Sequence, residues 1–355
     1  MSATSRYRMP AEWEPHAATW LAWPHNRTDW PGKFEPIPWV YCEIVYHLAR
    51  VERVRILVND ARSEEKARAA LTKANALRES VEFHRWPTNR GWTRDYGPIF
   101  VRCEGRRARS SVAVMNFQFN AWAKYHDCEL DEKIAARAAR ELGRDAVLPE
   151  VDAGGRRRRV VLEGGAIDVN GQGSMLTTAE CLLSVAQARN PGLGREQLER
   201  VFEQYLGVRH VIWLGAGIAG DDTHGHVDDI ARFCAPGTVA AAVETDRQDA
   251  NHAPLAANLA TLRAATDQDG RRLEVVELPM PRAIVFRGQR LPASYANFYI
   301  ANGLVLAPTF NDPNDRIALD TLAALFPGRT VVGIHCGDLV WGLGTIHCMT
   351  QQEPK

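Results

Sequence analysis

The chain alternates between two hydrophobic patterns along its 355 residues. Segments with apolar residues every three or four positions predict helices near residues 38–50, 62–75, 129–142, 193–206, 252–265 and 315–326. Short runs rich in β-branched and apolar residues predict strands. These runs are Val54–Val58, Val81–Trp86, Ile99–Cys103, Val112–Phe117, Val160–Leu162, Ala166–Asn170, Ser174–Thr178, His210–Trp213, Val227–Phe233, Val239–Val243, Arg272–Leu278, Phe298–Ala301, Gly303–Ala307 and Thr330–Ile334.

The excess of strands over helices bears on the fold class. A doubly wound sheet alternates strands and helices about one to one, whereas this chain has about two short strands for each helix. Several ββαβ units therefore fit the pattern better. Because no low-complexity linker interrupts it, we expect an α/β protein with residues 1–355 in a single domain.

Composition restricts the kind of partner. Lys plus Arg and Asp plus Glu both number 43, so no net charge favours nucleic acid or an anionic membrane. The short arginine-rich segments Arg106–Arg109 and Gly154–Arg159 lack interleaved aromatic residues and are interpreted as solvated turns. Met1 to Pro10 lack the apolar segment of a signal peptide, and no membrane span is present in the sequence. We expect a cytoplasmic protein with a small-molecule substrate; a homo-oligomer stays open.

Cys348 is the first candidate for chemistry. It is one of seven scattered cysteines, whose arrangement suggests neither a disulfide framework nor a zinc site. It follows Gly342 and Gly344 in a polar segment where a thiolate could act as a nucleophile. From this segment alone, a buried packing role for the thiol stays equally open.

Two loops at strand ends add candidates for binding. The loop Asn89–Pro98 carries Trp92 and Asp95, and an aromatic face beside a carboxylate suits a planar cation. Glu163, before Gly164 and Gly165, also lies at a strand junction. Ordinary turns with exposed charges would explain both loops equally well.

The densest cluster of ionisable residues runs from Gly220 to Asp229. If the segment is extended from Asp222, alternation places four side chains on one face: Asp222, His224, His226 and Asp228. One interpretation is a metallohydrolase using His224, His226 and Asp228, which chelators would inhibit and which would tolerate loss of Cys348. The other is a metal-free site with Cys348 as nucleophile and His226 as acid and base.

A guanidinium group suits the metal-free interpretation. It is planar and permanently charged, so Asp95 and Asp228 could clamp it and direct its carbon at a thiolate. Attack, proton donation by the histidine and loss of ammonia would leave an S-alkylthiouronium on the enzyme. The same histidine would then activate water and release a ureido product. His347 is adjacent to Cys348 and in an extended segment would point the other way, so His226 is the preferred partner of the thiol.

Five motifs, in order along nearly the whole chain, resemble the agmatine deiminase and bacterial (Porphyromonas-type) peptidylarginine deiminase family. The motifs are Met9-Pro10-Ala11-Glu12-Trp13-Glu14-Pro15-His16, Trp92-x-Arg94-Asp95-x-Gly97-Pro98, Glu163-Gly164-Gly165, Asp222-Thr223-x-Gly225-His226-x-Asp228 and Ile346-His347-Cys348-x-Thr350-Gln351-Gln352.

The resemblance implies a pentein fold, an α/β propeller of five ββαβ-type units with pseudo-fivefold symmetry. It implies a Cys348 nucleophile, a His226 acid and base, and guanidinium-binding carboxylates at Asp95 and Asp228. The implied reaction converts agmatine to N-carbamoylputrescine and ammonia without metal or organic cofactor. Deimination of arginine or peptidyl-arginine is the alternative within the family. The predicted substrate-binding residues are Trp92, Asp222, Glu163 and Gly344.

Three departures from the family pattern concern the substrate's far end. Lys124 lies in Asn120–Tyr125, where agmatine deiminases usually have Asn-Ala-Trp-Gly-Gly, and Gly342–Thr345 replaces the usual Gly-Gly-Gly-Asn. His224 replaces the usual Asp or Asn. If Lys124 faces the pocket, it disfavours the amine of agmatine and favours a carboxylate; otherwise it is a solvent-facing lysine.

Overall fold

The computed structural model describes residues 7–103 and 111–355. Its helices are α1 Ile37–Leu48, α2 Ala61–Lys73, α3 Thr93–Tyr96, α4 Ile134–Glu141, α5 Ala179–Leu183, α6 Arg195–Leu206, α7 His252–Ala264 and α8 Asn314–Leu325. Its strands are β1 Tyr7–Arg8, β2 His16–Ala22, β3 Arg53–Val58, β4 Val81–Arg85, β5 Ile99–Cys103, β6 Val112–Met115, β7 Asp145–Val147, β8 Glu150–Asp152, β9 Arg157–Arg159, β10 Asp168–Val169, β11 Ser174–Thr178, β12 His210–Leu214, β13 Ala231–Ala235, β14 Thr238–Val243, β15 Glu274–Pro279, β16 Val285–Phe286, β17 Gln289–Arg290, β18 Tyr299–Ala301, β19 Leu304–Thr309, β20 Thr330–His335 and β21 Gln351–Pro354.

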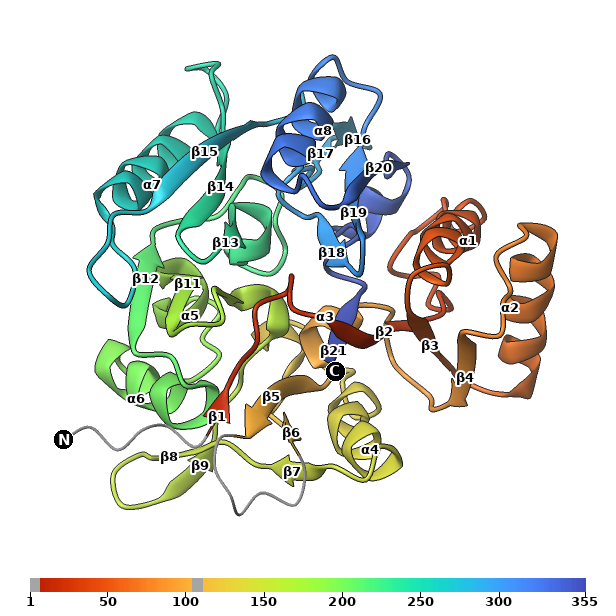
Figure 1. Cartoon of the computed structure of the whole chain (residues 1–355), viewed down its shortest axis with the longest axis horizontal. Helices are drawn as coiled ribbons and strands as arrows, with labels where there is room; N and C mark the ends of the chain where they lie inside the picture. The colour runs from red at the N-terminus through yellow and green to blue at the C-terminus, as the bar shows by residue number, and fades with distance from the viewer. Residues whose placement is uncertain (1–6, 104–110) are drawn as a thin grey trace.

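Within the described residues, five sheets of three or four strands repeat one pattern of pairing. In each, a central strand pairs antiparallel on one side and parallel on the other, and the parallel partner follows after a helical crossover. The central strands are β2, β6, β11, β14 and β19. Figure 1 shows these sheets arranged around the middle of the molecule with helices α1, α2, α4, α6, α7 and α8 outside. The predicted ββαβ pattern is therefore present.

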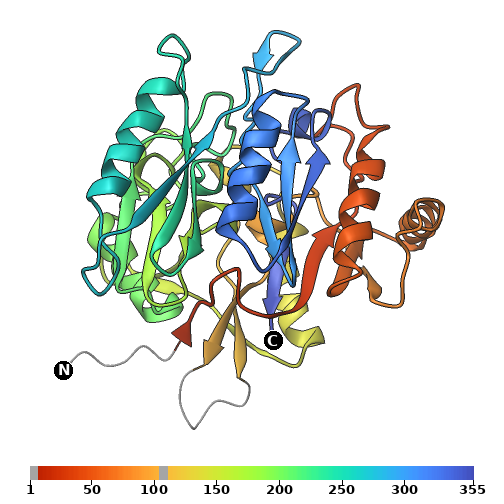
Figure 2. The same cartoon turned by 45° about the horizontal axis from the view of Figure 1, so that its top comes forward.

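The two ends of the described chain meet in one sheet. The C-terminal strand β21 pairs antiparallel with β2, near the N-terminus, with Trp20 opposite Gln351. Because this pairing fixes β21, it also fixes the turn just before it, which contains Cys348. Figure 2 shows the outer helices α7, α8 and α1 side by side on the rim, with the β16–β17 hairpin projecting above them.

Local sequence signals explain most helix positions. Asp60 caps α2, because its carboxylate accepts a hydrogen bond of 2.7 Å from the backbone N–H of Ser63. Gly207 ends α6 in the left-handed region with φ 72°. The inner face of α8 buries Ala318 and Leu322. None of the helices in the described ranges is long and apolar enough to cross a membrane.

Most of the predicted elements agree with the structure. The strand predicted at Val160–Leu162 is wrong, because Val161 forms only an isolated bridge with Gln118. The strand predicted at Val227–Phe233 is wrong at its start, because Val227–Asp229 forms a 3-10 turn, η4, and β13 begins only at Ala231. Ala166–Asn170 begins in another 3-10 turn, η3 (Gly164–Ala166). The predicted turn Gly154–Arg159 includes β9, whereas Arg106–Arg109 lies outside the described residues.

Candidate active site

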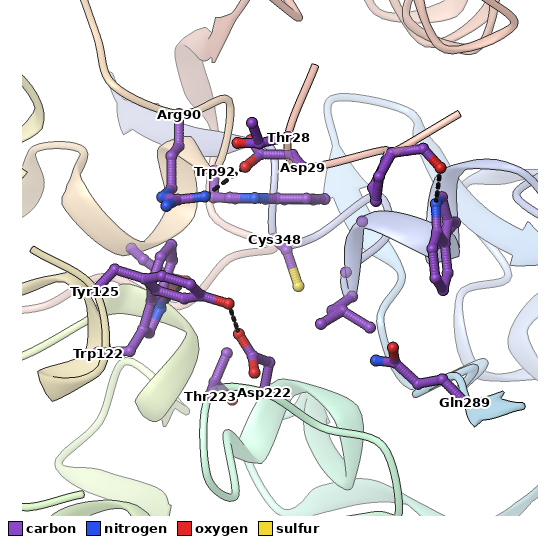
Figure 3. Close-up of a pocket in the computed structure, with 16 residues that line it drawn as sticks. Thr28, Asp29, Arg90, Trp92, Trp122, Tyr125, Asp222, Thr223, Gln289 and Cys348 are labelled. Carbon is purple, nitrogen blue, oxygen red and sulfur yellow. Dashed lines mark hydrogen bonds and ion pairs between the residues drawn. The ribbon is translucent and has the colours of Figure 1, made fainter. Parts of the chain in front are cut away.

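A pocket with a volume of about 250 Å³ opens above Cys348 (Figure 3). Four sequence-predicted residues besides Cys348 line it: Trp92, Asp95, Asp222 and Gly344. The lining is completed by Thr28, Asp29, Pro31, Arg90, Trp122, Tyr125, Thr223, Gln289, Trp341, Gly342 and Leu343. The wall combines four aromatic side chains with four charged ones, and such a mixture of apolar surface and a few polar groups is typical of a small-molecule site.

Each of the five repeated sheets contributes one polar residue near this pocket. In every case the residue lies a few positions before the first, antiparallel strand of its sheet, ahead of β5, β10, β13, β18 and β21. These residues are Asp95, Glu163, Asp228, Asn297 and Cys348. All five are buried. The shared pattern of the sheets therefore brings together residues that are far apart in the sequence. Beside two of these residues, for example, Nε of Arg94 donates to the backbone oxygen of His347, which is 253 positions away.

The thiol of Cys348 contacts an amide and a carboxylate. The side-chain N–H of Asn297 donates to Sγ over 3.1 Å, and Sγ lies 3.7 Å from Oδ2 of Asp228. Gly344 permits this arrangement, because a Cβ there would lie 3.2 Å from Sγ and 2.9 Å from the ring of Trp92. The glycine therefore lets the backbone approach the thiol closely.

Asp228 is also held by a chain of ionisable groups. Its Oδ2 lies 2.7 Å from Nδ1 of His347, and Nε2 of His347 lies 2.8 Å from Oε2 of Glu12. Glu12 also pairs with Arg94 and Arg232. The prediction that His347 points away from the site is wrong, because Ile346 to Met349 forms a turn rather than an extended segment.

His226 lies between two carboxylates. Its Nδ1 is 3.8 Å from Oδ1 of Asp95, and its Nε2 is 3.9 Å from Oε2 of Glu163. Gly165 lies where the side chains of His226 and Asp95 approach each other. A Cβ on Gly165 would lie 2.6 Å from Nδ1 of His226, 2.9 Å from Oδ1 of Asp95 and 3.1 Å from Oδ2 of Asp228. The Gly-Gly corner predicted as a turn thus leaves room for three functional groups to converge.

Asp95 is oriented by two donors. Its Oδ2 accepts 2.8 Å from the indole N–H of Trp122, and its Oδ1 accepts 3.1 Å from the backbone N–H of Gly165. Trp122 has a left-handed backbone with φ 58°, which Ala121 and Ala123 share. This unusual turn occupies the segment where the sequence departs from the family pattern, and it brings the indole to the carboxylate.

Burial and charge control the protonation of the site. Burial alone lowers the pKa of His226, but Asp95 and the other anionic neighbours outweigh it and raise that pKa well above its usual value. Burial, together with Asp228 and other carboxylates, raises the pKa of Cys348 well above its usual range. Despite burial, Arg189 and His226 lower the pKa of Glu163 to about 2. Burial raises the pKa of Asp95 to about 6, although His226 opposes that rise.

At neutral pH the free site therefore carries an imidazolium at His226 and a protonated thiol at Cys348. The pKa of Asp228 is lowered, because the hydrogen bond from His347 and the positive charges around the carboxylate together outweigh the effect of burial. Its carboxylate is consequently charged, and in the part of the chain that the structure describes its Oδ1 has no hydrogen-bond partner. An anionic, incompletely satisfied group facing a thiol favours binding of a cation.

Charged pairs form the outer part of the pocket. Asp222 accepts a hydrogen bond of 2.6 Å from the hydroxyl of Tyr125 and pairs with the ammonium of Lys124. Asp29 pairs with the guanidinium of Arg90 over 2.5 Å. Figure 3 shows Tyr125 directed at Asp222 on one side of the pocket and Gln289 on the other. Lys124 thus reaches a residue of the pocket, although 44% of its side chain is exposed.

The structure separates the residues of the predicted metallohydrolase site. His224 has φ 64°, so Asp222, His224, His226 and Asp228 do not lie on one face of an extended strand. Its Nε2 instead lies 2.9 Å from the hydroxyl of Ser184. Two other groups of residues in the described ranges bring metal-ligand atoms within 4.8 Å of one another: Glu163, Cys181 and His226, and Asp228, Asp229 and Cys348.

Sequence reasoning missed several residues around the site. Asn297, Glu12, Trp122 and Cys181 were given no role. The only local signal for Asn297 is a polar residue within the aromatic run Tyr295 to Tyr299. Its side chain connects the site, since Oδ1 accepts from the hydroxyl of Thr345 over 2.7 Å and Nδ2 donates to Asp229 over 3.0 Å. These contacts depend on tertiary structure, so no pattern in the sequence reveals them.

The fold and the pocket together define a class: α/β proteins of repeated mixed sheets with a buried cysteine, histidine and carboxylate site. The model of the Porphyromonas-type peptidyl-arginine deiminase family matches residues 8–354. The chain therefore belongs to the Porphyromonas-type peptidyl-arginine deiminase family.

Relatives of known structure or name agree with this assignment. The chain is 36% identical over 352 residues to a Legionella pneumophila protein named "Putative agmatine deiminase", a match that covers 98% of this chain and 95% of that protein. The structure of the agmatine deiminase of Enterococcus faecalis superposes with a TM-score of 0.89 at 30% identity, covering 100% of this chain and 99% of the other. That of a "Putative Arginine Deiminase" from Porphyromonas gingivalis has a TM-score of 0.83 at 34% identity, with 98% of each chain covered.

Proposed function

We propose that this protein is a guanidine deiminase, a hydrolase of C–N bonds in linear amidines, and that its substrate is agmatine. The observation that carries the proposal is the convergence at Gly165. His226 Nδ1, Asp95 Oδ1 and Asp228 Oδ2 surround one small space, and Asp228 Oδ2 is 3.7 Å from the thiol of Cys348. Two carboxylates and one imidazole beside a thiol are the groups that cleavage of a guanidinium requires.

In the first half of the reaction, the guanidinium binds between Asp95 and Asp228. Its positive charge offsets the carboxylates that raise the pKa of Cys348, so the thiol loses its proton to solvent when the substrate binds. The thiolate sulfur then forms a bond to the guanidinium carbon. His226, already an imidazolium, donates its proton to one nitrogen, and the C–N bond breaks to release ammonia.

In the second half, neutral His226 accepts a proton from a water molecule that attacks the thiouronium carbon. The C–S bond breaks, its electron pair returns to the sulfur of Cys348, and the ureido product leaves as its remaining hydroxyl proton passes to solvent. Glu163 stabilises the imidazolium in this cycle, because its own pKa of about 2 keeps it anionic. Asn297 donates to the sulfur over 3.1 Å and stabilises the thiolate in both halves.

The pocket supports a slender substrate. The rings of Trp92, Trp122 and Tyr125 line it, and an alkyl chain buries its apolar surface against such walls. Agmatine provides this chain and ends in an amine, which Asp222 attracts. Lys124 already pairs with Asp222, so free arginine or peptidyl-arginine is the alternative substrate within the same reaction class.

We also propose that residues 1–355 form one catalytic domain, a pentein propeller. Its five ββαβ-type units would be related by pseudo-fivefold symmetry, and the active site would lie on the axis. The repeated pairing in five sheets and the one polar residue that each supplies support this arrangement. We place the enzyme in the cytoplasm, acting on a small cationic guanidino compound.

The proposal is tested by measuring ammonia release and product mass with agmatine, free arginine and a peptide ending in arginine. The enzyme is stripped of metal first, and Cys348→Ala is the control variant. We expect turnover of agmatine that the control lacks. Turnover that persists in the Cys348→Ala variant would contradict the mechanism, whereas preference for arginine or the peptide would change only the substrate.

A further inference from the structure

Cys181 is a buried nucleophilic group that the proposed mechanism does not use. It lies in the short helix α5 and is completely buried. Its sulfur, a carboxylate oxygen of Glu163 and a ring nitrogen of His226 all lie within 4.8 Å of one another. One sulfur, one nitrogen and one oxygen donor thus converge at the histidine, which is the proposed acid and base.

Nitrogen and oxygen atoms of this cluster lack hydrogen-bond partners among the described residues. Both ring nitrogens of His226 and Oε2 of Glu163 are buried and find no hydrogen-bond partner within residues 7–103 and 111–355. Arg189 donates to the other oxygen, Oε1, over 2.9 Å, which leaves Oε2 facing Nε2 of His226 at 3.9 Å. That separation is too long for a hydrogen bond. Buried polar atoms normally have partners, so these atoms are free to bind a ligand placed between them.

We propose that Cys181, His226 and Glu163 form an inhibitory zinc-binding site. A thiolate, an imidazole and a carboxylate are the ligand types that zinc prefers, and three protein ligands leave a fourth position for water. Two tetrahedral ligands about 2.0–2.2 Å from zinc lie about 3.4 Å apart. Nε2 and Oε2 are 3.9 Å apart, so a shift of about 0.5 Å brings both onto one ion.

The charge balance of the cluster also favours the replacement of protons by zinc. When zinc binds, it displaces one proton from the thiol and one from the imidazolium. The two lost positive charges equal the charge of the zinc ion. The net charge of the buried cluster, including Arg189, is therefore unchanged. This balance matters because a buried charge without compensation is costly.

Zinc bound at Nε2 of His226 leaves the single ring proton on Nδ1, the nitrogen nearest Asp95. The ring then cannot accept a further proton, so it no longer cycles between imidazolium and imidazole. The inhibition depends on the function proposed above, whereas zinc binding itself does not. The thiol of Cys348 complicates the test, because ligand atoms of Asp228, Asp229 and Cys348 also lie close enough together to bind a metal ion. The binding experiment therefore uses protein that lacks the thiol of Cys348.

The binding test compares three metal-stripped proteins: Cys348→Ala, Cys348→Ala with Cys181→Ala, and Cys348→Ala with Cys42→Ala. Cys42 is a matched control, since it is a buried cysteine in the hydrophobic core. Zinc affinity is measured by competition with a chromophoric chelator, and cobalt is used to detect metal–thiolate absorption. Thermal melting verifies that each variant is folded.

We expect the Cys348→Ala protein to bind one zinc ion and to show cobalt–thiolate absorption. Loss of Cys181 should weaken zinc binding about 100-fold or more, whereas loss of Cys42 should not change it. The proposal is overturned if the Cys348→Ala protein binds no zinc and shows no thiolate absorption, or if removal of Cys181 leaves the affinity unchanged. The Cys348→Ala measurement tests the site even if a Cys181 variant does not fold.

A separate activity test uses enzyme with Cys348 intact. Zinc should inhibit it reversibly, with recovery after addition of a chelator, and Cys181→Ala should require about 100-fold more zinc for the same inhibition relative to its own zinc-free rate. Equal zinc sensitivity of the two proteins would contradict the inhibitory role. Absence of deiminase activity with every guanidine would contradict the proposed function and leave the binding result intact.

Discussion

Replacement of Gly165 by alanine tests how closely the functional groups converge. The added Cβ would lie 2.6 Å from Nδ1 of His226, where ordinary contacts begin at 3.4 Å. The imidazole must therefore move by about 0.8 Å, and Asp95 and Asp228 must also shift. A misplacement of about 1 Å in a catalytic geometry costs about 100-fold in rate, so we expect kcat/KM to fall by about that factor.

The assay measures kcat/KM for ammonia release in Gly165→Ala and in a control variant, Gly328→Ala. Gly328 has no heavy atom within 4 Å of its added Cβ and no left-handed backbone, so its replacement should leave the rate unchanged. Overpacking a buried site costs about 1–3 kcal/mol of stability, which thermal melting detects while the protein stays folded. A folded Gly165→Ala enzyme with wild-type kcat/KM would refute the convergence of these three groups.

Three further predictions concern the nucleophile, its pKa and the substrate's far end. Cys348→Ser should abolish nearly all turnover and His226→Ala most of it in the ammonia assay; a Ser variant with a near wild-type rate would exclude the nucleophile. Because the pKa of Cys348 is raised, its alkylation by neutral iodoacetamide in the free enzyme should increase with pH and continue to increase above pH 9. A rate that is constant above pH 8 would show that this pKa is not raised. Lys124→Ala should lower KM for agmatine several-fold with little change in kcat, because Asp222 loses a competing cation. The exposed Lys133→Ala is its control, and an unchanged or higher KM would contradict the competition.

The sequence predicts most of the fold because local patterns dominate the repeated units. Six helices lie within a few residues of their predicted positions, and β11 has the predicted bounds. The strand β2 was missed, since it is buried along nearly its whole length and shows no alternation of polar and apolar residues. The two-residue strands β16 and β17 are too short for any periodic signal.

The candidate site could be predicted in its residues but not in its geometry. Cys348, His226, Asp95 and Asp228 stand in motifs, yet the extended face proposed for Asp222 to Asp228 is wrong, because a left-handed residue and a 3-10 turn interrupt it. The contacts of Asn297 with Cys348 and of His347 with Asp228 join distant parts of the chain. Such contacts follow from the packing of separate sheets, which hydrophobic periodicity along the sequence does not encode.

The most direct test of the central claim is to detect the covalent intermediate. Metal-stripped enzyme is mixed with agmatine, quenched in acid during turnover, digested and analysed by mass spectrometry. We predict a peptide that contains Cys348 and carries the mass of agmatine less ammonia, and no such adduct in Cys348→Ala. Turnover without any adduct on Cys348, together with ammonia release by the Cys348→Ala variant, would contradict nucleophilic catalysis by this thiol.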